Sequence, residues 1–305
     1  MWNHLFGRWL RKIGIPEDNM INAKEYTAQK CRVSKCCTEG ETNMNQYSKI
    51  REIINSCEIA YISCFCKCCE DEQIIRYRDS QLTDMYDHNF TFIKKALSKD
   101  ALQQVIREEI EQNLHENKDF CKITMDVLPD EKCLEVLDRK LEIEHYGKYA
   151  YISMKSPEWK TTDACQILKM TDPSMIEDLA SMDLIHDSGS SGEDFCNRRA
   201  RRRGEVYLSE IPLDSYICYF NGIPVGNCDL FLHNSTAKIE DFAVLPEYQR
   251  RGIGTTILKH MIDTALMKSA ATIYLIADED DTAKEMYLKL GFVKIADSYA
   301  LFSKL

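Results

Sequence analysis

Residues 244–254 read Val-Leu-Pro-Glu-Tyr-Gln-Arg-Arg-Gly-Ile-Gly, and this stretch predicts a strand end, a glycine turn and a helix start in direct succession. The strand pattern covers 238–245, and an amphipathic helix is expected over 254–269. At a helix start several main-chain N–H groups lack an acceptor and lie at the positive end of the helix dipole. The stretch therefore predicts a diphosphate-binding site, to which Arg250 and Arg251 add positive charge.

Composition limits the class of protein. The chain has 305 residues, enough for two domains, and 44% of them are hydrophobic, so it is expected to fold. The net charge of −10 argues against general nucleic-acid binding. No apolar run approaches the roughly 20 residues of a membrane span, and the basic residues interleaved with apolar ones at the start of the sequence lead us to expect no secretory signal. The fourteen cysteines are therefore interpreted as reduced thiols, and a cytoplasmic location is expected.

Shifts in pattern divide the chain into four parts: an N-terminal extension (1–43), an α+β domain of unknown function (44–155), a linker (156–163) and a C-terminal domain (164–305). Residues 2–13 of the extension have the pattern of a basic amphipathic helix. Such a helix makes weak contact with a membrane surface or a partner, or else packs on the protein's own body.

Several elements are predicted from local pattern alone. A strand is expected over 59–66 and a helix over 131–141, and residues 187–193 read as a flexible Gly/Ser loop. Asn221-Gly222 between two apolar runs predicts a hairpin with a tight turn.

Two motifs in the C-terminal domain carry a family resemblance. Gln249-x-x-Gly252-x-Gly254 lies between a strand and a long helix, and Ala283-x-x-x-Tyr287-x-x-x-Gly291-Phe292 follows downstream. With these motifs the domain resembles the GNAT superfamily of acetyl-CoA-dependent N-acyltransferases. The resemblance implies a mixed α+β fold whose mostly antiparallel sheet splays open and is flanked by helices. The preceding α+β domain, which lacks the glycine loop, is interpreted either as a degenerate copy of this fold or as a separate module.

The resemblance also implies where acetyl-CoA binds as cosubstrate. Pantetheine is expected to pair with the main chain of the 238–245 strand, and the N–H groups of 250–255 to receive the diphosphate. The implied cofactor-binding residues are Phe242, Ala243, Val244, Gln249, Arg250, Arg251, Gly252, Ile253, Gly254, Thr255 and Asp280. Asp280 departs from the asparagine that many relatives carry there, and an aspartate lacks the N–H donor.

Acetyl transfer needs a proton for the leaving thiolate and a base for the amine. The resemblance implies Tyr287 as the acid. Glu240 is the predicted base, with Asp241 as the alternative. Strict strand alternation places Glu240 on the face of Phe242, whereas a β-bulge would exchange the faces.

The predicted function is transfer of an acetyl group from acetyl-CoA to a small-molecule or peptide amine, by direct attack. The alternative is a non-catalytic acyl-CoA sensor or scaffold with the N-terminal half as a partner module. The acceptor and the oligomeric state stay open.

Two clusters have open interpretations. The arginines at 198, 199, 201, 202 and 203 either recognise an acidic acceptor or the cofactor's ribose phosphate, or form a solvated face. Cys64, Cys66, Cys68 and Cys69 either bind zinc or copper(I) or are free thiols, and the prediction is that no metal is bound.

Overall fold

A computed structural model describes residues 39–130, 134 and 141–305 of the chain. The predicted amphipathic helix 2–13 lies outside the described residues, and so does most of the helix predicted over 131–141.

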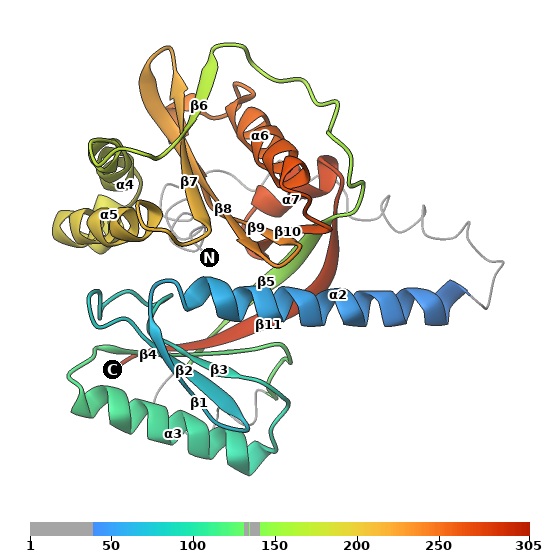
Figure 1. Cartoon of the computed structure of the whole chain (residues 1–305). Coiled ribbons are helices and arrows are strands. Elements are labelled where there is room, and N and C mark those ends of the chain that lie inside the picture. The colour runs from blue at the N-terminus through green and yellow to red at the C-terminus, as the bar shows by residue number, and fades with distance from the viewer. Residues whose placement is uncertain (1–38, 131–133, 135–140) are drawn as a thin grey trace, which may run out of the picture.

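The described strands form one eleven-stranded sheet in the order β1-β2-β3-β4-β11-β5-β10-β9-β8-β7-β6 (Figure 1). Neighbouring strands are antiparallel except for the parallel pairs β3–β4 and β9–β10. The strands are β1 (Lys67–Glu70), β2 (Ile74–Arg78), β3 (Thr91–Ile93), β4 (Phe120–Met125), β5 (Glu142–Tyr151), β6 (Cys165–Lys169), β7 (Leu213–Phe220), β8 (Ile223–His233), β9 (Thr236–Val244), β10 (Thr272–Asp278) and β11 (Phe292–Lys304). The predicted class, mixed α+β with a mostly antiparallel sheet, is confirmed.

Strands β5 and β11 join the two halves of the molecule (Figure 1). β5 lies between β10 and β11, with Tyr274 opposite Ala150 on one edge and Phe292 opposite Tyr151 on the other. β11 then pairs along its second edge with β4. The parts predicted as domains 44–155 and 164–305 therefore share a single sheet, and their boundaries stay a sequence-based prediction.

Helices cover both faces of this sheet. α2 (Glu39–Ile62), α4 (Met175–Ser191) and α5 (Glu193–Tyr207) contribute to one apolar core, and α6 (Ile253–Met267) and α7 (Ala283–Lys289) to a second. Tyr274 and Leu275, consecutive on β10, belong to these two different cores, so the cores lie on opposite faces. α3 (Lys99–His115) packs in a third core, with Ile74 on its side of β2 and Ile75 facing the α2 core.

Two local predictions were wrong. The run predicted as a strand over 59–66 is helical through Ile62, because Ile54, Cys57 and Tyr61 are buried at helical spacing on the same face. The predicted loop at 187–193 is helical through Ser191. Only Gly192, at φ +85°, is non-helical, and it separates α4 from α5. The predicted hairpin is present as β7 and β8, joined at Asn221-Gly222.

Two arginines of α5 connect this helix to the N-terminal half. Arg198 makes a bidentate ion pair with Asp84, at 2.9 and 2.6 Å. Arg202 contacts Asp79 and donates a hydrogen bond to the carbonyl oxygen of Phe65 at 2.5 Å. These side chains are therefore occupied in packing the two halves together.

Candidate functional site

The sheet opens between β9 and β10. The two strands pair only from Thr236 opposite Thr272 to Lys238 opposite Tyr274. β9 continues to Val244 along β8, and β10 continues to Asp278 along β5, so the two facing edges separate beyond the last pair. This separation leaves main-chain groups of β9 available to pair with a ligand.

The predicted turn and helix start follow directly after β9. Arg250 and Gly252 have positive φ angles, of 60° and 81°, and α6 begins at Ile253. The first main-chain donor with a helical acceptor is Thr256, whose N–H donates to the Gly252 carbonyl at 3.0 Å. The N–H groups ahead of it at the helix start have no helical acceptor, which is the arrangement that binds phosphate.

A β-bulge lies in β9. Asn227 of β8 lies opposite Ala243 and Asp229 lies opposite Glu240, so two β9 residues correspond to the single Cys228 between them. Asp241 adopts φ 51°, and Asn227 Nδ2 donates to its carbonyl oxygen at 2.6 Å and to its carboxylate at 2.7 Å. The bulge puts Glu240 and Phe242 on opposite faces, so the strict alternation considered for the sequence does not hold here.

A cavity of about 380 Å³ occupies the opening. Its lining comes from β9, from the turn and the start of α6, from α7 and, on the other face of the sheet, from α4. The cavity therefore passes between the separated strands. Nine of the predicted site residues line it: Phe242, Ala243, Val244, Gln249, Arg250, Gly252, Gly254, Thr255 and Tyr287.

Four predicted residues do not line this cavity. Ile253 is buried in the apolar core, and Arg251 is exposed with its guanidinium 5.2 Å from the centre of the Tyr248 ring. Asp280 is exposed, and its neighbour Asp281 lines the cavity instead.

Glu240, the fourth, is buried next to Lys238, whose ammonium lies 2.9 Å from its carboxylate. Burial acts to raise the pKa of Glu240, but the Lys238 charge acts to lower it, and the net pKa is below its ordinary value. The carboxylate is thus ionised at neutral pH, on the face of the sheet that α2 covers.

Tyr287 lies on α7, with only 3% of its surface exposed. Its ring centre is 6.4 Å from those of Phe242 and Tyr149 and 6.0 Å from that of Phe292. This aromatic packing fixes the position of the ring in the cavity wall.

α4 supplies a wall of the cavity that was not predicted from the sequence. Asp183, His186 and Asp187 line the cavity; Asp187 begins the loop predicted over 187–193, and the other two precede it. Arg199 of α5 reaches Asp183 at 3.0 Å and Asp187 at 2.7 Å. Arg203 lies 3.5 Å from Asp183 and also pairs with Asp241. The two aspartates are four residues apart on α4, and Arg199 and Arg203 are four residues apart on α5. This matched spacing could have predicted the pairing from the sequence.

Residues 182–292 match the acetyltransferase (GNAT) family. The uncharacterized N-acetyltransferase C663.13c of Schizosaccharomyces pombe is 36% identical over 107 residues, which cover 32% of this chain and 74% of that protein. The chain belongs to the GNAT family. The resemblance inferred from the two motifs is therefore confirmed, and the opening between β9 and β10 is the splay that it implied.

Similarity extends beyond the GNAT region. The uncharacterized N-acetyltransferase CgeE of Bacillus subtilis is 26% identical over 232 residues, covering 74% of this chain and 88% of that protein. A crystal structure of a functionally unknown conserved protein from Staphylococcus epidermidis has a TM-score of 0.66 at 22% identity, covering 78% of this chain and 94% of that one. At this identity the structural likeness shows the fold alone.

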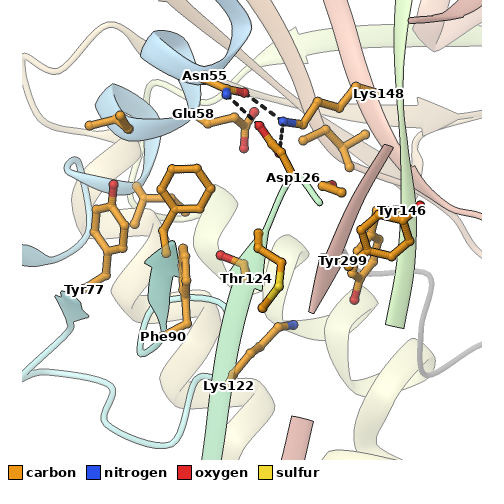
Figure 2. A pocket seen from close by; sticks show the side chains of 16 residues that line it. Asn55, Glu58, Tyr77, Phe90, Lys122, Thr124, Asp126, Tyr146, Lys148 and Tyr299 are labelled. Carbon is orange, nitrogen blue, oxygen red and sulfur yellow. Dashed lines mark hydrogen bonds and ion pairs between the residues drawn. The ribbon is translucent and has the colours of Figure 1, made fainter. Parts of the chain in front are cut away.

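This GNAT protein has another cavity, of about 80 Å³, between α2 and the sheet, with lining residues from β4, β5, β10 and β11 among others (Figure 2). Aromatic side chains form much of its wall, and a polar group joins α2 to the sheet on one side. In that group Lys148 Nζ donates to Asp126 at 2.6 Å and to Asn55 at 2.8 Å, and Asn55 Nδ2 donates to Asp126 at 2.7 Å. The three side chains satisfy one another, so their role is to hold α2 on the sheet.

Replacing Asp126 with alanine is expected to lower the free energy of unfolding by about 3 kcal/mol, because the Lys148 ammonium, 4% exposed, loses its counter-charge. Lys148→Met should cost less, since the Asp126 carboxylate is 20% exposed and can be hydrated. Urea denaturation of both variants and of the double variant measures the coupling. If the loss of unfolding free energy in the double variant equals the sum of the losses in the two single variants, the two side chains do not form a direct ion pair.

The cysteine cluster is divided between two elements. Cys64 and Cys66 follow α2, and their thiols donate to the carbonyl oxygens of Ala60 and Ile62, whereas Cys68 and Cys69 are exposed on β1. Among the residues whose side chains the structure describes, no three His, Cys, Asp or Glu side chains come together as a metal site. No helix among the described residues has the length and apolar character needed to cross a membrane.

Proposed function

We propose that this chain transfers an acetyl group from acetyl-CoA to an amine. The supporting observation is the continuity of three features: the free edge of β9, the turn at Gly252 and the uncapped start of α6. Together they suit an elongated ligand that has a hydrogen-bonding amide chain at one end and a diphosphate at the other.

The residues divide along that ligand. The main chain of 242–244 would pair with the pantetheine arm, and the N–H groups of 250–255 would receive the diphosphate, with Arg250 at the cavity rim. Gln249 Nε2 donates to the Val244 carbonyl at 3.1 Å, which ties the turn to the strand end. We assign Arg251, Ile253 and Asp280 no side-chain contact, since none of these side chains lines the cavity.

The transfer requires an amine nitrogen to attack the thioester carbonyl carbon, while the carbon–sulfur bond breaks and the thiolate gains a proton. Tyr287 is the proposed donor of that proton, because its ring lines the cavity beside Phe242. No cysteine of the described chain lines this cavity, which favours direct attack over an acyl-enzyme. Glu240 stays the sequence's candidate base, and a proton would have to reach it through water.

Tyr287→Phe is expected to reduce kcat by about 100-fold or more, because it removes the proton donor and keeps the aromatic packing. The Kd for acetyl-CoA should change little. Thiol release from acetyl-CoA with a panel of amines measures the first quantity, and titration calorimetry the second.

The same two measurements distinguish acetyl transfer from the alternative function. A sensor or scaffold would bind acetyl-CoA tightly and release no thiol with any amine, and Tyr287→Phe would then alter neither result. The acceptor class, whether small molecule or peptide, and the cytoplasmic location both stay predictions.

A further inference from the structure

One cavity-lining side chain is left unexplained by the proposed function. His186 of α4 lies in the wall opposite α6 and α7, and its ring nitrogen Nε2 is buried without a hydrogen-bond partner among the described residues. Buried polar atoms are rarely left unpaired, and a catalytic role is one explanation for an atom that is. This cavity-lining imidazole therefore carries a ring nitrogen that no described residue engages.

The charged groups around His186 are engaged with one another. On its own helix, Asp183 and Asp187 both pair with Arg199 of α5, and Asp183 is also near Arg203. On β9, Asp241 also lines the cavity and is held by Asn227 and Arg203. Since these carboxylates already have cationic or amide partners, none of them makes an ion pair with the imidazole in the described structure.

The same surroundings keep the ring neutral near pH 7. Burial lowers the pKa of His186 below its usual 6.5, while Asp187 and Asp183 act in the opposite direction and Arg199 adds to the lowering. The remaining charged or titratable groups that line the cavity are Arg250 from the turn, Asp281 ahead of α7 and Tyr287. A neutral imidazole with an unpaired nitrogen is suited to accept a proton.

We propose that His186 is the base that takes the proton from the attacking amine, an inference that rests on the acetyl-transfer function proposed above. The amine nitrogen forms a bond to the thioester carbon, and its surplus proton passes to Nε2 of His186. The carbon–sulfur bond breaks, and the thiolate takes a proton from Tyr287. The imidazolium and the phenolate then return to their starting states by exchanging a proton through solvent, so the products are the amide and free CoA.

The test uses the full chain, acetyl-CoA and three amine acceptors: an alanyl tripeptide, spermidine and benzylamine. A reaction without amine is the blank. His186→Gln should lower kcat/KM for thiol release at pH 7 by about 100-fold or more, with the Kd for acetyl-CoA unchanged. The wild-type rate should fall as pH decreases through a midpoint below 6.5, because protonation removes the base, and His186→Gln should lose this limb. Millimolar imidazole should restore thiol release to His186→Ala, a rescue that a purely structural role would not produce.

Two control variants sharpen the result. His260→Gln makes the same change at a histidine of α6 that packs on Tyr216 and lies outside the cavity lining, so it should keep both the rate and the pH limb. Glu240→Gln tests the base predicted from sequence. Circular dichroism and acetyl-CoA binding verify that each variant is folded.

Three outcomes would overturn the assignment: an unchanged rate and pH profile in His186→Gln, loss of the acid limb in Glu240→Gln alone, or wild-type protein that binds acetyl-CoA and releases no thiol with any acceptor. The first two results would remove only the base, whereas the last would leave the cofactor site standing but would refute acetyl transfer and favour the sensor. Absence of acetyl-CoA binding by the wild type would refute both the cofactor site and the proposed function.

Discussion

Replacing Gly252 with glutamate is expected to raise the Kd for acetyl-CoA by about 100-fold or more, which corresponds to about 2.8 kcal/mol. The substitution adds a carboxylate directly before the first turn of α6, where the unpaired N–H groups would receive the diphosphate. Repulsion between the carboxylate and the diphosphate, together with occupation of the N–H groups by the new side chain, should both weaken binding. Titration calorimetry with acetyl-CoA and with CoA measures the change.

Gly252→Ala is the matched control. The added Cβ meets no atom within 4 Å, so the ligand-free protein has room for it, and only the φ of 81° opposes it. A left-handed non-glycine residue costs about 1–2 kcal/mol, so alanine should lower the melting temperature while affecting affinity less than glutamate does. Equal affinities of the glutamate variant and the wild type would show that the diphosphate does not bind at this turn.

The fragment 156–305 should fail to fold as a stable monomer, although it contains the whole GNAT match at 182–292. Without β5, β10 loses its antiparallel neighbour and β11 loses the partners of both its edges, since β4 is absent as well. The deletion also exposes the apolar core that α2 covers, including Tyr274, which is fully buried in the whole chain. We expect no cooperative thermal transition and no acetyl-CoA binding by the fragment.

Residues 39–305 provide the control for that fragment, because they keep every described element. This longer fragment should unfold cooperatively and bind acetyl-CoA. Circular dichroism at equal protein concentration compares its thermal unfolding with that of the 156–305 fragment. A cooperative, acetyl-CoA-binding 156–305 fragment would show that the shared sheet is dispensable and that the sequence-based boundaries mark independent domains.

Short-range features were readable from the sequence. The hairpin at Asn221-Gly222 and the succession of strand, glycine turn and helix at 244–254 depend on backbone preferences of a few neighbouring residues. The second motif around Tyr287 added the family, and with it the expected splay of the sheet. These features were enough to predict nine residues of the cavity wall.

Other local patterns were ambiguous because burial decides them. The apolar run at 59–66 suits a strand as well as a buried helix, and contact with the sheet makes it helical through Ile62. The Gly/Ser stretch at 187–193 looked flexible, but the pairing of Asp187 with Arg199 holds most of it in α4. In both cases contacts with residues outside the run stabilise the helix.

The sequence by itself determined the glycine turn before α6, the hairpin at Asn221-Gly222 and the family. Each of these can be recognised from short runs of residues. Only the tertiary structure placed β5 between β10 and β11, separated Glu240 from Phe242 through the β9 bulge, and brought His186 to the cavity. Those outcomes depend on pairings between residues far apart in the chain. Such pairings are selected by the packing of the whole sheet, and no local pattern specifies them.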